Sequence, residues 1–189
     1  MIAAVVLAAG ASARLGEPKQ LVKLAGETLL ERAVRTAREA GCSPVVVVLG
    51  VAYEEILGRS RLGDTVRVIN AEWAEGMASS IRLGVQALGT VARHANGVVL
   101  MACDQPAVTS AHLRALVASG DVTASAYAGR RGVPAYFPAS TFAALMELRG
   151  DRGARELLRT AQAIELTNGE LDVDTAADVA AAERLFGKP

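Results

Sequence analysis

The chain has 189 residues, and 51% of them are hydrophobic, which is enough to bury the core of one domain spanning residues 1–189. Its 20 Lys and Arg residues are balanced by 20 Asp and Glu residues. Proteins that bind nucleic acid or a membrane surface generally need a basic excess. We therefore expect neither among the partners of this chain.

Cysteine and histidine are scarce, with two residues of each. Cys42 and Cys103 cannot build a disulfide framework and lack the spacing of a zinc site, and His94 and His112 are too few for a histidine-built metal site. Any metal would be held by oxygen atoms, which favours Mg²⁺. Without a basic n-region or an apolar run long enough to span a membrane, the sequence predicts a cytoplasmic location.

The first half of the chain alternates short apolar runs with amphipathic segments. The apolar runs predict strands at 2–7, 45–49, 66–69 and 98–101. The amphipathic segments predict helices at 28–40, 53–58 and 78–88. Thr28 and Glu31 form a capping box at the start of the first helix, Gly41 ends it, and Gly89 ends the third. This alternation is typical of an α/β fold with a parallel sheet.

The pattern changes after the fourth strand. A helix is predicted at 109–118, and strands at 124–127 and 134–137 flank a turn over residues 129–132, so an antiparallel hairpin is expected in the C-terminal half of a mostly parallel sheet. Helices follow at 140–148 and 154–161, with a turn over 150–153 and short strands at 163–166 and 170–173. A final helix over 175–186 opens with Thr175 and Asp178 as a capping-box pair.

A loop of small residues follows the first strand and contains Gly10 and Gly16. Its backbone N–H groups can point at an anion, and Arg14 and Lys19 are the only cations over residues 8–19. Ligands of open α/β sheets bind outside the carboxyl ends of the strands. The loop therefore predicts a site for a phosphate chain. A plain glycine-rich turn is the alternative, but it leaves Arg14 and Lys19 unexplained.

Carboxylates follow two later strands. Asp104, at the end of the fourth strand, is compatible with a metal ligand or a helix cap, and the neighbouring Cys103 with a small buried side chain. Asp172 and Asp174 alternate along a predicted strand and so share a face. Asp174 either points into the same cleft as Asp104 or lies in a solvated turn, whereas Asp178 is expected to cap the last helix.

Two further segments leave their roles open. Residues 70–81 follow the third strand and open a helix, so that Ser79 and Ser80 are compatible with capping and Trp73 with a core or pocket position. Arg130 and Arg131 lie in the predicted turn of the hairpin, which is either a phosphate site for an acceptor or a solvated tip.

The N-terminal segment Leu7-Ala8-Ala9-Gly10-x-Ser12-x-Arg14-x-Gly16-x-x-Lys19 resembles the signature LAAGxSxRxGxxK of nucleotidyltransferases, which transfer a nucleoside monophosphate from a nucleoside triphosphate. The resemblance implies a three-layer Rossmann-like nucleotidyltransferase fold. It also implies that the loop wraps the triphosphate while Arg14 and Lys19 neutralise it. The residues thereby implied in nucleotide binding are Leu7, Ala8, Ala9, Gly10, Arg14 and Lys19.

Two acidic motifs resemble the same family. Cys103-Asp104-Gln105-Pro106 resembles its (G/C)DQP motif, which implies that Asp104 binds Mg²⁺ and the nucleotide and takes part in catalysis with Arg14 and Lys19. Asp172-Val173-Asp174-Thr175 resembles the start of its DxDTPxD motif, which implies that Asp174 is the second metal ligand. Ala176 replaces the usual proline, a change that affects how the helix starts.

Residues 70–81 resemble the NxxWxxGmasSi segment of molybdenum cofactor cytidylyltransferases, which implies that Asn70, Gly76 and Ser80 line the nucleotide pocket. Residues 132–135 and 150–155 also match patterns of that subgroup, but Val133 replaces its usual histidine, which leaves the acceptor open. The guanylyltransferase branch usually has a second glycine where this chain has Ala9. The additional methyl group favours a pyrimidine base.

The resemblance therefore implies transfer of CMP from CTP to the phosphate of molybdopterin, with release of pyrophosphate and Mg²⁺ as cofactor. Three alternatives stay open. The first is a guanylyltransferase that uses GTP, and the second a nucleotidyltransferase with another phosphorylated acceptor. The third is a non-enzymatic protein that delivers the cofactor to an apo-molybdoenzyme or its chaperone, against which the intact Arg14, Lys19, Asp104 and Asp174 argue.

Overall fold

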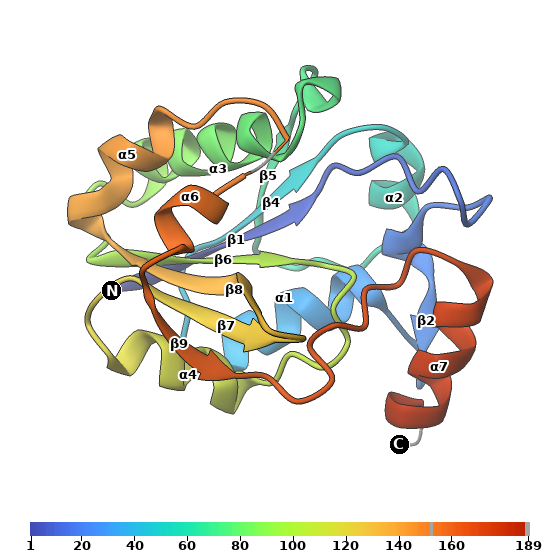
Figure 1. Cartoon of the computed structure of the whole chain (residues 1–189). Coiled ribbons are helices and arrows are strands. Elements are labelled where there is room, and N and C mark those ends of the chain that lie inside the picture. The colour runs from blue at the N-terminus through green and yellow to red at the C-terminus, as the bar shows by residue number, and fades with distance from the viewer. Residues whose placement is uncertain (152, 188–189) are drawn as a thin grey trace.

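The computed structural model describes residues 1–151 and 153–187, which form a three-layer α/β/α fold (Figure 1). The strands are β1 Ile2–Ala8, β2 Lys23–Leu24, β3 Glu27–Thr28, β4 Val45–Leu49, β5 Val66–Ile69, β6 Gly97–Ala102, β7 Thr123–Tyr127, β8 Arg130–Pro138 and β9 Gln162–Glu165. The helices are α1 Leu29–Glu39, α2 Tyr53–Arg59, α3 Met77–Val91, α4 Ser110–Ala118, α5 Phe142–Met146, α6 Arg155–Leu158 and α7 Ala176–Phe186. Short 3₁₀ turns lie at η1 Lys19–Leu21, η2 Trp73–Glu75 and η3 Ala139–Thr141.

Within the described residues, seven strands form the central sheet in the order β5-β4-β1-β6-β8-β7-β9. All its neighbouring pairs are parallel except the two that involve β8. From β1 the chain first builds β4 and β5 on one side and then crosses through α3 to β6 on the other side. The order of strands therefore reverses at β1 and β6, and a ligand is expected outside their carboxyl ends.

Alternate residues of β1 serve the two faces of the sheet. Ala4 and Val6 pack with side chains of α1, α2 and α4, whereas Ala3 and Val5 pack with side chains of α3, α5 and α6. A strand that is covered on both faces must be apolar throughout, which explains the continuous hydrophobic run at the N-terminus. A smaller core joins Val22, Leu24 and Leu29 to Val173 and to Ala182 of α7.

Both predicted capping boxes are present. Thr28 accepts a hydrogen bond from the backbone N–H of Glu31, and Thr175 accepts one from that of Asp178. Gly41 follows α1 with a φ of +89°, as a glycine that ends a helix should. No helix within residues 1–151 and 153–187 is both long and apolar enough to cross a membrane.

The fold differs from the sequence-based expectation in its turns. The predicted strand at 170–173 is absent, because the backbone there bonds to nearby turns, as Leu171 N does to Asn168 O and Asp172 N to Glu170 O. The hairpin turn consists only of Ala128 and Gly129, both with positive φ, so Arg130 and Arg131 already belong to β8.

The other differences concern helix ends and short elements. α3 continues through Gly89 to Val91 instead of ending before that glycine. The predicted helix at 140–148 is divided into η3 and α5, and the one at 154–161 is shortened to α6. The pair β2–β3 was not expected from the sequence. Arg152, in the predicted turn at 150–153, lies outside the described residues.

Candidate active site

The loop after β1 folds back so that Lys19 returns to the end of the strand. Gln20 is 1% exposed, and its side-chain amide donates hydrogen bonds to Ala8 O at 2.7 Å and Gly10 O at 3.2 Å. The Ser12 hydroxyl accepts a hydrogen bond from Lys19 N at 2.9 Å. These internal bonds hold the glycine-containing loop in one shape and bring the Lys19 side chain to the carboxyl edge of the sheet.

The Lys19 ammonium lies between two carboxylates. Its Nζ is 2.6 Å from Asp104 Oδ2 and 2.6 Å from Asp174 Oδ1. Arg14, which is far more exposed, contacts the other oxygen of Asp174 at 2.9 Å. Burial alone would lower the pKa of Lys19, but the Asp104 charge and the hydrogen bonds to both carboxylates outweigh it and raise that pKa. Lys19 therefore stays charged at neutral pH.

A backbone hydrogen bond helps to bring the C-terminal carboxylates to Asp104. Val173 N donates to Asp104 O at 3.0 Å, and the Val173 side chain is fully buried in the small core beneath α7. With Val173 fixed, Asp172 and Asp174 flank it at the edge of the sheet. Their proximity to Asp104 follows from this contact and the capping box of α7, and not from the strand alternation that the sequence suggested.

A cavity of about 220 Å³ opens above the loop, and we call it the loop cavity. It brings together most of the residues predicted to bind a nucleotide. Its predicted members are Leu7, Ala8, Ala9, Gly10, Lys19, Gly76, Ser80 and Asp104. It is also lined by Gln20, Trp73, Met77, Ala102, Cys103 and Asp151. Arg14 and Asp174 are not in its wall, but they lie at its edge through their contacts with one another and with Lys19.

Asn70 is placed behind the loop cavity and not in its wall. It is 4% exposed, and its side-chain amide donates to Ser79 Oγ at 2.8 Å and to Ser80 Oγ at 2.9 Å. Its Oδ1 accepts from Glu72 N at 2.9 Å. The geometry therefore gives Asn70 the task of positioning Ser80 and the turn that carries Trp73.

Gly76 joins that turn to α3 in a conformation that requires glycine. Its φ is +117°, and a Cβ there would come within 2.7 Å of Asp151 Cα. Ala78 N also donates to Gly150 O at 3.1 Å. The start of α3 and the segment at 150–151 thus close one side of the loop cavity together.

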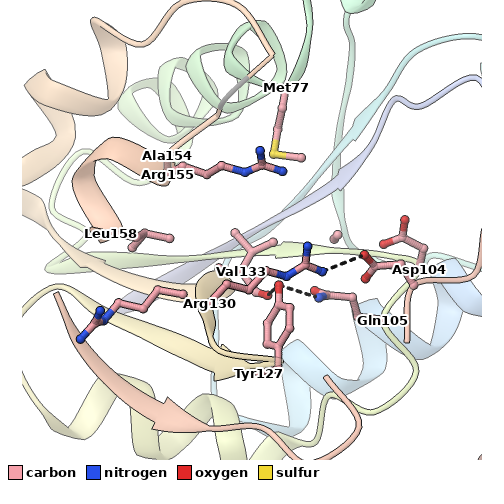
Figure 2. A pocket seen from close by; sticks show the side chains of 13 residues that line it. Met77, Asp104, Gln105, Tyr127, Arg130, Val133, Ala154, Arg155 and Leu158 are labelled. Carbon is pink, nitrogen blue, oxygen red and sulfur yellow. Dashed lines mark hydrogen bonds and ion pairs between the residues drawn. The ribbon is translucent and has the colours of Figure 1, made fainter. Parts of the chain in front are cut away.

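A second cavity, of about 150 Å³, lies on the other side of Asp104 beside the β7–β8 hairpin, and we call it the hairpin cavity (Figure 2). Met77 and Arg155 face Tyr127 across it. Tyr127 donates a hydrogen bond to Val133 O at 3.0 Å and accepts one from the Gln105 amide at 3.3 Å. Met77, Ala102 and Asp104 line both cavities, so the two sites meet at the end of β6.

Asp172 belongs to the hairpin cavity. The partial burial of Asp172 raises its pKa to about 6, and the negative charge of Asp104 adds to this effect. Burial also raises the pKa of the Cys103 thiol, which keeps it protonated and argues against a nucleophilic role. Cys103 instead packs with the core beneath α1.

Asp104 and Asp174 fit a divalent cation, because oxygen atoms of both reach one positively charged atom. Within the described part of the chain no group of three or more His, Cys, Asp and Glu residues could hold a metal. Mg²⁺ is usually held by one or two carboxylates together with substrate phosphates. The pair is therefore suited to a metal that arrives with a nucleotide. In this structure the Lys19 ammonium lies between the two carboxylates.

Several residues of the site were missed by the sequence reasoning. Gln20 lines the loop cavity, and Tyr127 and Arg155 line the hairpin cavity. The one sequence signal for Gln20 is a polar residue next to Lys19 in a loop of small residues. Tyr127 carried no signal, because its position depends on the turn of the hairpin.

Comparison with known proteins shows that the chain is similar to NTP transferases. The MobA-like NTP transferase domain matches residues 4–166. Nicotine blue oxidoreductase of Paenarthrobacter nicotinovorans is 32% identical, over 98% of this chain and 95% of its own. A probable molybdenum cofactor guanylyltransferase of Opitutus terrae is also 32% identical, over 86% of this chain and 79% of its own.

A solved structure has the same architecture. Rv0371c of Mycobacterium tuberculosis is 34% identical over 97% of each chain, with a TM-score of 0.83, and a second structure of that protein is a complex with manganese. The fold and the two cavities that meet at Asp104 agree with the family match over residues 4–166. The chain therefore belongs to the MobA-like NTP transferase family.

Proposed function

We propose that this chain transfers CMP from CTP to the terminal phosphate of molybdopterin, with Mg²⁺ as cofactor and pyrophosphate as the second product. The observation that carries the proposal is the position of Asp104 and Asp174 around one cation, where two cavities meet. One cavity has the motif residues of a triphosphate site, and the other leaves space for an acceptor. Both substrates are ones that we expect the protein to meet in the cytoplasm.

The chain's own residues would act mainly by positioning and by neutralising charge. Arg14 and Lys19 would turn from the carboxylates to the β- and γ-phosphates and stabilise the leaving pyrophosphate. Asp104 and Asp174 would hold Mg²⁺, which neutralises charge on the phosphates when bound. The acceptor phosphate would enter from the hairpin cavity in line with the leaving group. No general base is needed, because a phosphate monoester is already an anion near neutral pH.

The preference for CTP rests on Ala9. This residue is 7% exposed and lines the loop cavity. Its neighbour is Gly50, where a Cβ would approach Ala9 Cβ to 2.9 Å. The sizes of residues 9 and 50 together determine where this wall of the loop cavity lies. Ala9→Gly would enlarge the space for the base and is expected to shift selection toward GTP.

The test is a competition between CTP and GTP with molybdopterin as acceptor, followed by identification of the dinucleotide product. The proposal expects a cytosine product from the wild-type chain and a larger share of guanine product from Ala9→Gly. A guanine product from the wild-type chain would replace the proposal by the guanylyltransferase alternative. Nucleotide binding without pyrophosphate release for any phosphorylated acceptor would favour delivery of the cofactor to an apo-molybdoenzyme or its chaperone.

An oxidoreductase is a second candidate, because the relative with that name aligns with 98% of this chain. The two carboxylates and two cations that meet at Lys19 suit a phosphate and metal site, which favours nucleotidyl transfer. An assay of oxidoreductase activity without nucleoside triphosphate distinguishes the two candidate functions. We expect no change in the absorbance of nicotine blue when the protein is supplied with a reduced nicotinamide donor.

A further inference from the structure

Arg130 and Arg131 are neighbours in sequence but differ in their surroundings. Arg130 is the first residue of β8 and is paired with Tyr127 across the hairpin, so its Cζ lies 5.1 Å from the centre of the Tyr127 ring. Arg131 Nη1 instead donates to Arg159 O at 3.4 Å. Both residues line the hairpin cavity, so what separates them is that the Arg131 guanidinium already donates to a backbone carbonyl.

The Arg130 guanidinium is held only loosely. Its Nη2 lies 3.9 Å from Asp172 Oδ2, which is too long for a hydrogen bond, and both side chains are more than a third exposed. Such a pair contributes little stability and can be exchanged for another partner. Within the described part of the chain no acceptor forms a hydrogen bond with the Arg130 side chain. Its planar set of N–H donors is therefore available to a ligand.

The surroundings of Arg130 indicate the chemistry of that ligand. Arg130, Asp172 and Asp104 all line the hairpin cavity, and Figure 2 shows the Arg130 side chain directed toward Asp104. Tyr127, Val133 and Leu158 provide apolar or aromatic walls. An oxyanion between Arg130 and the metal-binding carboxylates would thus be attached to a flat, largely apolar body.

We propose that Arg130, and not Arg131, binds the phosphate of the acceptor in the hairpin cavity, exchanging Asp172 for a bidentate contact. A guanidinium matches two phosphate oxygens at once, which a lysine cannot do. The acceptor class is a phosphate monoester with a planar body. The proposal rests on the proposed function for the identity of the reaction, but not for the binding of the phosphate.

The test compares Arg130→Gln with Arg131→Gln, a matched pair that removes the same charge from adjacent positions. Phenyl phosphate serves as the probe, and its binding is followed by ³¹P NMR. Wild type and Arg131→Gln should bind it equally, whereas Arg130→Gln should bind it about tenfold more weakly or worse, as expected for loss of a charged bidentate contact. Arg130→Lys should recover only part of the affinity.

Nucleotide binding is measured on the same samples through the fluorescence of Trp73, the only tryptophan in the chain, which lines the loop cavity. CTP affinity should be unchanged in all three variants, which also verifies that they are folded. In turnover assays Arg130→Gln should raise the KM for the acceptor and leave the KM for CTP unaltered.

Three results of the binding experiment would overturn the inference. These are equal losses in the two Gln variants, wild-type affinity in Arg130→Gln, and failure of the wild-type protein to bind phenyl phosphate at millimolar concentrations. Failure of the proposed function would look different from failure of the inference. If the protein transferred no nucleotide, Arg130→Gln would still bind phenyl phosphate more weakly than Arg131→Gln. Turnover with an acceptor KM that is unaffected in Arg130→Gln would leave the proposed function intact and contradict the inference alone.

Discussion

Lys19 Nζ lies 2.6 Å from an oxygen of Asp104 and 2.6 Å from an oxygen of Asp174, and so holds the two carboxylates together. A divalent cation could take the place of this ammonium group. Two facing carboxylates without a cation would repel one another, so the lysine stabilises the site when no nucleotide is bound. In the proposed metal site, the same lysine would compete with any metal that approaches alone. A triphosphate that attracts Lys19 would remove the competitor, and this would couple nucleotide binding to metal binding.

The first prediction concerns metal binding when the Lys19 charge is removed. Lys19→Gln removes the resident charge, so Mn²⁺ should bind in the absence of nucleotide about tenfold more tightly than it does to wild type. This corresponds to roughly 1.4 kcal/mol and is measured by electron paramagnetic resonance. Lys23→Gln, at an exposed position of β2, is the matched control and should bind Mn²⁺ as wild type does. Equal Mn²⁺ affinities for Lys19→Gln and wild type would show that the lysine does not guard the carboxylates.

At the scale of elements, α3 lies directly on the sheet because Gly84 has no side chain. A Cβ at Gly84 would meet Val5 Cγ1 at 2.5 Å and Val48 Cγ2 at 3.2 Å, whereas a Cβ at Gly89 meets nothing within 4 Å. The two glycines of one helix therefore have opposite roles. Gly84 permits close packing, and Gly89 only weakens the helix.

The second prediction compares these two glycines. Gly84→Ala should lower the free energy of unfolding by about 1–3 kcal/mol through overpacking. Gly89→Ala should raise it by about 0.5–1 kcal/mol, since alanine is the better helix former. Urea denaturation measures both changes. A stabilised Gly84→Ala would mean that α3 can move away from the sheet without loss.

A buried histidine supports the strand that carries Val133. His112 Nε2 is 2.8 Å from Ser125 Oγ, and Ser125 donates to Pro134 O at 2.6 Å. Because the serine hydroxyl donates to the carbonyl, it must accept from an N–H of His112. The chain of bonds joins α4, β7 and β8 at the irregular register of the hairpin.

The third prediction concerns the pH dependence that this histidine causes. Burial lowers the pKa of His112, so the unfolded chain takes up a proton at that site before the folded chain does. The contribution of His112 to the free energy of unfolding is therefore fully present above the pKa of about 6.5 that this histidine has in the unfolded chain. It is lost as pH falls below that value, by at most about 1.4 kcal/mol per pH unit. Urea denaturation between pH 8 and pH 5.5 should show this loss in wild type and His94→Gln, and a smaller one in His112→Asn. An identical pH dependence in His112→Asn would contradict the assignment.

The sequence predicted best the features that depend on neighbouring residues. The strands at Val45–Leu49 and Val66–Ile69 and the two capping boxes are such features, and the structure confirms them. Asp172 beside the hairpin cavity could not be predicted in this way. Its position depends on the bond between Val173 N and Asp104 O, which joins distant parts of the chain.

At the scale of the whole molecule, the two larger cores share the strands of one sheet. Val5 faces one core and Val6 the other, so neither core can open without disturbing β1. α7 packs on Val22 and Leu24 near the N-terminus, which ties the two ends of the described chain together. We therefore propose that residues 1–189 form a single domain.

The fourth prediction is one cooperative unfolding transition for the whole chain. Far-UV circular dichroism and Trp73 fluorescence should give the same midpoint and the same slope in urea. An earlier, separate transition would show that part of the chain, such as α7 with the β2–β3 pair, unfolds independently.

Pyrophosphate release is the most direct test of nucleotidyl transfer at the point where the two cavities meet. With CTP, Mg²⁺ and molybdopterin, the wild-type chain should release one pyrophosphate for each dinucleotide formed. Asp104→Asn and Asp174→Asn should each reduce the rate about a hundredfold or more while remaining folded, and Asp64→Asn, at an exposed loop position, should retain it. Wild-type rates in Asp104→Asn, or no release from the wild-type chain with any phosphorylated acceptor and either CTP or GTP, would contradict the account.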